Sequence, residues 1–173
     1  RMEASCVTPN VWVKADPTQI HQILVNLCSN ASQAMGTRGG RVDIRVDRVH
    51  ITARHSPDLE AGDYCRILVS DTGPGIPQKL RQHIFEPFFT TRSGSGGTGL
   101  GLSVVKGIVM GLKGRISLSS RRSRGAAFEV LLPAVDAPAP EWKSAAKKNV
   151  TVNTGAGSGR ILFVDDETGM VGG

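Results

Sequence analysis

The chain has 173 residues, 39% of them hydrophobic, and a formal net charge of +6 at neutral pH. This length allows one ordinary domain of about 100–150 residues with a buried core, and no apolar run approaches the roughly 18 residues of a membrane span. The first residues lack the layout of a signal peptide, so we expect a cytosolic protein that makes no direct contact with a membrane.

The positive charge suggests a nucleic-acid partner, because phosphate backbones are bound chiefly by Lys and Arg. The densest basic clusters are residues 121–124 and 143–148, in an expected hairpin turn and an expected linker. Neither is interleaved with aromatic residues that could stack on bases, so we expect no nucleic-acid partner. Cys6, Cys28 and Cys65 form no C-x-x-C pair, and we interpret them as reduced core thiols.

The first predicted element is a helix over residues 17–35. Asp16 and Pro17 are typical of an N-cap followed by a first helical residue, and Gly36 ends the element. Apolar residues with helical spacing form one face, and they are Ile20, Ile23, Leu24, Leu27, Ala31 and Met35.

Two strands follow in the prediction, over residues 41–49 and 64–69. The first alternates Val and Ile with charged residues, as a half-buried strand does, and the second is more apolar. A short helix is predicted over residues 77–84 and a longer one over 99–112.

A hairpin of strands 115–120 and 127–132 completes the predicted elements. Helices and strands alternate irregularly, which favours an α/β sandwich with a mixed sheet over a doubly wound parallel sheet. We expect this domain to occupy residues 1–133. Residues 134–159 have the Ala, Pro, Lys, Ser and Gly content of a flexible linker, and residues 160–173 begin a further, truncated unit.

The stretch GSGGTGLGL, residues 94–102, contains a G-x-G-x-x-G pattern. A dinucleotide fingerprint requires a strand directly before these glycines and a helix directly after them. Only the helix is predicted, because Pro87 and the Ser and Gly residues after it are typical of a loop. The following helix instead offers free N–H groups and the positive end of its dipole to a phosphate chain.

Two further sites carry polar side chains suited to a nucleotide. Asn26 and Asn30 are one helical turn apart, and alone they would be ordinary exposed amides. An amide oxygen is also a neutral hard ligand for Mg²⁺ whose charge is balanced by phosphates. Asp71, close to Gly73 and Gly75, forms either an ordinary turn or an acceptor for an exocyclic amine beside glycines that admit a flat ring.

Four motifs occur in order along the chain: QILVNLCSNASQAM, DTGPGIP, IFEPFFTT and GTGLGL. Together they closely resemble the four boxes of the ATP-binding catalytic domain of sensor histidine kinases, in the superfamily shared with type II topoisomerases, mismatch-repair ATPases and heat-shock ATPases. The resemblance covers nearly all of residues 10–132. It implies a Bergerat-type ATP-binding fold, in which helices cover one face of a mixed sheet, and it implies ATP and Mg²⁺ as cofactors.

The resemblance also implies roles for individual residues. Asn30 matches the Mg²⁺ ligand and Asp71 matches the acceptor of the adenine amine. Phe88 and Phe89 match the anchor of a mobile lid over residues 90–98. The full implied set for ATP is Asn26, Asn30, Asp71, Gly73, Gly75, Ile76, Phe88, Phe89, Arg92, Gly97, Thr98, Gly99, Leu100 and Gly101.

Hydrolysis of ATP and simple nucleotide binding are the alternatives within this superfamily. In hydrolysing relatives a glutamate stands one helical turn before the Mg²⁺ asparagine, where it acts as a general base. Asn26 occupies that position and cannot accept a proton at neutral pH, which favours phosphoryl transfer. None of the four histidines lies in a phosphoacceptor box, so the acceptor is expected on a dimerisation and histidine-acceptor domain upstream.

Two other features bear on the family resemblance. Many members follow the second asparagine of the first box with Lys-Tyr, whereas this chain has Ala31-Ser32, so a lysine contact with phosphate is missing. Residues 160–167 resemble the opening strand of a response-regulator receiver, with Asp165 and Asp166 as its Mg²⁺-binding acids. This second resemblance implies a hybrid kinase with a receiver domain downstream.

Overall fold

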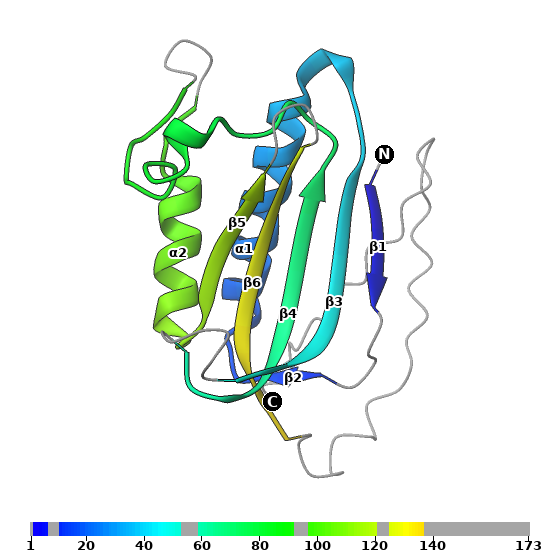
Figure 1. Ribbon diagram of the computed structural model, residues 1–173, viewed down its shortest axis with the longest axis vertical. Helices are drawn as coiled ribbons and strands as arrows, with labels where there is room; N and C mark the ends of the chain where they lie inside the picture. The colour runs from blue at the N-terminus through cyan, green and yellow to red at the C-terminus, as the bar shows by residue number, and fades with distance from the viewer. Residues whose placement is uncertain (1, 7–10, 53–58, 92–96, 121–124, 137–173) are drawn as a thin grey trace, which may run out of the picture.

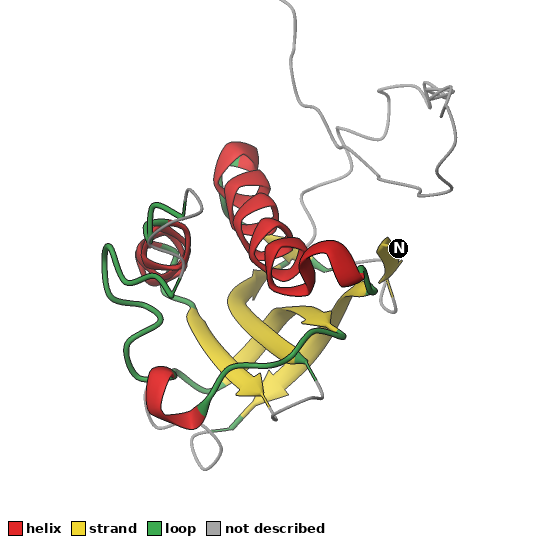
Figure 2. Ribbon diagram, turned by 90° about the horizontal axis from the view of Figure 1, so that it is seen from above, coloured by secondary structure: helices red, strands yellow, loops and turns green. Residues whose placement is uncertain are grey.

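The computed structural model describes residues 2–6, 11–52, 59–91, 97–120 and 125–136 (Figure 1). In this part of the chain, α1 and α2 lie on the same side of a twisted β-sheet (Figure 2). The elements are β1 (Met2–Cys6), β2 (Trp12–Val13), α1 (Pro17–Met35), η1 (Gly36–Arg38), β3 (Val42–Ile51), β4 (Gly62–Asp71), η2 (Gln78–Leu80), α2 (Gly101–Gly111), β5 (Arg115–Ser120) and β6 (Ala126–Val135).

The sheet is mixed. Strand β4 pairs antiparallel with β3 on one side and with β6 on the other, and β5 pairs antiparallel with the remaining side of β6. Strand β1 runs parallel to β3, and the short β2 pairs with the end of β6. The predicted α/β class, with helices on one face of a mixed sheet, is therefore confirmed.

Helix α1 begins and ends where the sequence predicts. The Asp16 Oδ1 accepts hydrogen bonds from the Thr18 backbone N–H at 2.8 Å and from the Thr18 hydroxyl at 2.6 Å, which caps the first turn. Pro17 occupies the first turn, where its missing N–H costs nothing. At the other end, the Gly36 N–H donates to the Ser32 carbonyl.

The core lies between the two helices and the sheet. Alternate residues of β3, β4 and β6 point toward the helices, and each large apolar side chain that is fully buried there stabilises the fold by about 1.5–3 kcal/mol. The buried apolar cluster consists of Ile23, Leu27, Ala31, Val42, Cys65, Ile67, Val69, Ile84, Val105, Val109, Ala126, Phe128, Val130 and Leu132. This core sets the positions of the ends of α1, β4 and α2.

The predicted helix over residues 77–84 is wrong in extent. Only residues 78–80 form a 3₁₀ helix, and hydrogen-bonded turns follow it. The segment is too short to nucleate an α-helix by itself, and the burial of Ile84 in the core dictates its path instead. Strands β1 and β2 were not predicted, because so few residues show no clear periodicity and their partners are distant in sequence.

The last strand passes the predicted domain boundary at residue 133, since β6 continues to Val135. Most of the predicted linker and the whole receiver-like segment, residues 137–173, lie outside the described residues. None of the helices in the described part of the chain combines the length and apolar character needed to cross a bilayer.

Candidate functional site

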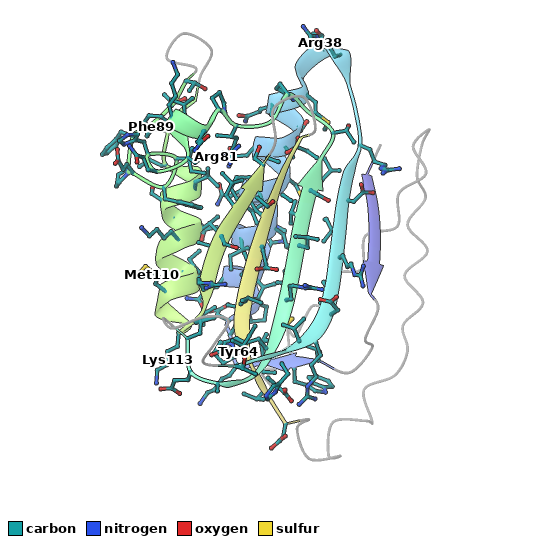
Figure 3. The ribbon with its side chains drawn as sticks, viewed as in Figure 1. Arg38, Tyr64, Arg81, Phe89, Met110 and Lys113 are labelled. Atoms are coloured by element: carbon teal, nitrogen blue, oxygen red, sulfur yellow. The ribbon has the colours of Figure 1, made fainter. Side chains whose placement is uncertain are left out.

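A cavity of about 650 Å³ opens between the C-terminal half of α1, the end of β4, the η2 segment and the start of α2. Figure 3 shows Phe89 and Arg81 at this end of the molecule and Tyr64 and Lys113 at the opposite end. The predicted site residues that line the cavity are Asn26, Asn30, Asp71, Gly75, Ile76, Phe89, Gly97, Thr98, Gly99 and Gly101. The fold thus gathers residues of all four sequence motifs around one space.

Asp71 is held in place at the end of β4. Its Oδ1 accepts hydrogen bonds from the Gly73 N–H at 2.7 Å and from the Ala126 N–H at 3.3 Å. Its Oδ2 makes no hydrogen bond to any residue that the structure describes. A carboxylate oriented in this way has one oxygen left for a donor in the cavity, such as an exocyclic amine.

Gly73 stands beside this carboxylate rather than on the cavity wall. Of the glycines predicted to lie beneath a flat ring, Gly75 lines the cavity and Gly73 does not. Ile76 lines the cavity beside Gly75. The contribution of Gly73 is the backbone N–H that orients Asp71.

The amides of Asn26 and Asn30 lie against the beginning of α2. A Cβ atom at Gly101 would be 3.0 Å from Asn26 Oδ1 and 3.8 Å from Asn30 Nδ2. The Asn26 side chain donates to the Gln22 carbonyl at 2.9 Å, whereas the buried Asn30 Nδ2 has no hydrogen-bond partner among the residues that the structure describes. The first turn of α2 adds unpaired backbone N–H groups and the positive end of the helix dipole.

This end of the cavity fits a metal-bound phosphate chain. The buried Asn30 Nδ2, which has no partner among the described residues, is a donor suited to a phosphate oxygen, and the oxygen of the same amide is a suitable neutral ligand for Mg²⁺. Over the described ranges, no group of three or more His, Cys, Asp or Glu side chains could hold a metal alone. A bound Mg²⁺ would accordingly share its ligands between Asn30 and the phosphates.

The side chains of the neighbouring residues Phe88 and Phe89 lie in different surroundings. Phe89 lines the cavity, whereas Phe88 is 73% exposed and has a positive φ of 65°. The cause is a close backbone crossing, because a Cβ atom at Gly99 would lie 2.4 Å from the Phe88 carbonyl carbon. Leu100 is 38% exposed and also lies off the wall, so neither Phe88 nor Leu100 occupies the predicted place at the cavity.

The lid is predicted over residues 90–98, and its residues 92–96, which include Arg92, lie outside the described residues. Several wall residues were not anticipated. Ser29 and Gln33 extend the Asn26 and Asn30 stripe along α1, and helical spacing could have indicated them. Ala126 had no such signal, because 55 residues separate it from Asp71.

The family model for histidine kinase-, DNA gyrase B- and HSP90-like ATPases matches residues 15–136, which include every described residue of the cavity wall. The chain belongs to this family. Among curated members, sensor kinase CckA of Brucella abortus (strain 2308) is 40% identical over 169 residues, which cover 91% of this chain and 18% of CckA. The sensory histidine kinase/phosphatase NtrB of Klebsiella oxytoca is 37% identical over 118 residues, 68% of this chain and 32% of NtrB.

Solved structures of histidine kinases share the ATPase fold. The mycobacterial sensor histidine kinase MprB superposes with a TM-score of 0.62 at 25% identity, over 79% of this chain and 84% of MprB. Full-length ShkA in complex with AMPPNP superposes with a TM-score of 0.63 at 29% identity, over 80% of this chain and 26% of ShkA. This chain therefore spans a fifth to a third of the curated kinases that it matches.

Proposed function

We propose that the chain is the catalytic domain of a two-component sensor histidine kinase, which binds Mg-ATP and donates its γ-phosphoryl group to a histidine on a separate dimerisation and acceptor domain. One observation carries the proposal. The oriented carboxylate of Asp71 and the amide of Asn30, whose Nδ2 has no partner in the described part of the chain, line the same cavity, although β4 and α1 supply them independently.

Each end of the cavity has a distinct role. Asp71 Oδ2 accepts the exocyclic amine of adenine, and the Gly75–Ile76 wall lies along the flat base. The N-terminus of α2 and the glycines before it receive the phosphates. Mg²⁺, when bound, neutralises phosphate charge, and Asn30 is its protein ligand.

The wall of the cavity favours transfer over hydrolysis. Among the described residues that line it, Asp71 is the one carboxylate and there is no histidine. Asp71 is bonded to backbone amides at the end of β4, and the residue beside the start of α2 is Asn26. An asparagine cannot take a proton from water, which supports a nucleophile that another domain supplies and that docking positions.

The relatives support the same assignment and suggest its partners. ShkA was solved with AMPPNP, and histidine kinase ThkA was solved in complex with the response regulator TrrA. The CckA alignment covers 91% of this chain, which is more than residues 15–136. We propose that an acceptor domain precedes this domain in the parent protein and that the linker at 134–159 leads to a receiver domain.

Phosphotransfer between separate pieces tests the proposal. The chain is mixed with γ-labelled ATP, Mg²⁺ and the dimerisation and histidine-acceptor module of its parent protein. We expect acid-labile, base-stable label on the acceptor, at a rate that rises with acceptor concentration, because tethering normally supplies a millimolar effective concentration. An acceptor whose histidine is replaced by Ala should remain unlabelled.

Two other outcomes would support the alternatives. Rapid release of phosphate by the chain alone, with no labelled acceptor at any concentration, would identify a hydrolase. Tight ATP binding with neither transfer nor hydrolysis would identify a nucleotide-binding module.

A further inference from the structure

A single buried hydroxyl links the cavity-wall residue Ile76 to Gly125, which directly precedes the wall residue Ala126. Ser120, the last residue of β5, is 6% exposed. Its Oγ accepts a hydrogen bond from the Ile76 N–H at 2.8 Å and donates one to the Gly125 carbonyl at 3.0 Å. Ile76 lies in the segment between β4 and η2, 44 residues earlier in the chain.

The same hairpin also orients the Asp71 carboxylate. Ser120 is the register partner of Ala126, whose N–H donates to Asp71 Oδ1 at 3.3 Å. Gly125 packs directly on the Asp71 backbone, since a Cβ atom there would lie 1.8 Å from the Asp71 carbonyl oxygen. Ser120, Gly125 and Ala126 thus contact both sides of the proposed adenine slot, which is the space between the Asp71 carboxylate and the Gly75–Ile76 wall.

We infer that Ser120 is a positioning residue for base recognition. It is absent from the described cavity wall, yet it sets the separation between the Asp71 carboxylate and the Gly75–Ile76 wall. This inference rests on the proposed function, because the slot width matters only if a purine base occupies it. Its consequence is selectivity for the base as well as affinity.

The two hydrogen bonds of Ser120 Oγ require a hydroxyl group at this position. A hydroxyl accepts from one group and donates to another at the same time, and an apolar side chain does neither. Without it, the part-buried Ile76 N–H and the buried Gly125 carbonyl both lose their partner, and they can regain one only if the segment that holds Ile76 and the β5–β6 hairpin separate. Separation widens the slot on the side of the base and leaves the phosphate end at α2 unchanged.

Ser120→Thr and Ser120→Val form a matched pair, because Thr and Val have the same shape and differ in the hydroxyl. Affinities for Mg-ATP and Mg-GTP are measured on the whole chain by competition with a fluorescent nucleotide. We expect Ser120→Thr to bind ATP within about threefold of the parent. Ser120→Val should bind ATP about tenfold more weakly, with a lower ratio of ATP to GTP affinity, as expected for the loss of a buried hydrogen bond.

A control variant, Val109→Ala, distinguishes an effect on the width of the adenine slot from an effect of lower stability alone. Val109→Ala removes buried apolar atoms of α2 away from the cavity wall, and it should lower the melting temperature without changing the ATP to GTP ratio. If Ser120→Val does not fold, Ser120→Ala removes the same hydroxyl without added bulk and carries the same expectation.

The outcomes are distinct. Equal losses in Ser120→Thr and Ser120→Val, or an unchanged ATP to GTP ratio in the variant that lacks the hydroxyl, would overturn the role of Ser120 while leaving ATP binding intact. A parent chain that binds neither nucleotide would instead overturn the proposed function, and the role in base recognition with it.

Discussion

Asp47 and Arg66 face each other on β3 and β4 and form a two-point ion pair, with Arg66 Nε 2.8 Å from Asp47 Oδ1 and Nη2 2.6 Å from Oδ2. The pair lies on the sheet face opposite the core residues Val46 and Ile67. The Asp47 side chain is only 9% exposed. The hydrogen bonds from Arg66 lower the pKa of the Asp47 carboxyl, and the charge of Arg45 adds to this effect.

A lowered pKa in the folded state makes this ion pair a source of pH-dependent stability. The contribution is complete above the ordinary aspartate pKa of about 3.9 and is lost as the pH falls through the lower pKa of the folded protein. We expect Asp47→Asn to lower the free energy of unfolding by about 1–3 kcal/mol at pH 7. In urea unfolding from pH 7 to 3, the difference from the parent should shrink below pH ~4.

Asp63→Asn is the matched control for that experiment. Asp63 pairs with Arg48 and His50, but its side chain is 38% exposed, and solvent-exposed pairs contribute little to stability. A loss in Asp47→Asn that stays constant over the whole pH range would show that packing, and not the charge, accounts for it.

Asp71→Asn should weaken adenine-nucleotide binding by about 1.5–3 kcal/mol, the range for a charge-assisted hydrogen bond. The variant keeps one oxygen for the amides of Gly73 and Ala126 but replaces the other with an amino group that opposes the amine of adenine. Discrimination against GTP should fall as well. Calorimetric titration with both nucleotides provides the measurement, and unchanged ATP affinity in a folded variant would remove the adenine role.

Asn30→Ala should lose mainly the Mg²⁺-dependent part of ATP affinity, because its amide oxygen is the proposed metal ligand. Since Asn30 Nδ2 has no partner in the described structure, the substitution should cost little stability. Titrations with ATP are compared in Mg²⁺ and in EDTA. If both affinities fall by the same factor, Asn30 shapes the cavity and does not bind the metal.

Gly125→Ala should destabilise the fold and weaken ATP binding together. Gly125 has a φ of 80°, and a Cβ atom at this position would overlap the Asp71 carbonyl, so strain of about 1–3 kcal/mol is expected. Gly107→Ala is the control, since Gly107 is an exposed residue of α2 with open space around it. That change should raise stability by up to about 1 kcal/mol. Thermal unfolding that ranks the two variants in the opposite order would contradict the packing described for the hairpin.

Secondary-structure elements could be predicted from the sequence where the residues that specify them lie within or next to the element. Helix α1 has its predicted bounds because Asp16, Pro17 and Gly36 act within one turn of its ends. The alternation of apolar and charged residues predicted β3, the apolar character of residues 64–69 predicted β4, and the order of the four motifs predicted the family. The family resemblance of these motifs, and not any single local pattern, implied that Asn30, Asp71 and the glycines before α2 belong to one site, and they line one cavity.

How the parts of that site meet depends on contacts between residues that are distant in the sequence. Phe88 and Phe89 are equivalent in the sequence, but the crossing of Gly99 over the Phe88 backbone leaves one ring exposed and the other on the cavity wall. Ser120 and Ala126 carry no motif, yet they hold Ile76 and Asp71 in place. Contacts between residues 44 and 55 positions apart depend on the register of β4, β5 and β6, and that register is set by burial of the whole sheet face, which no local pattern contains.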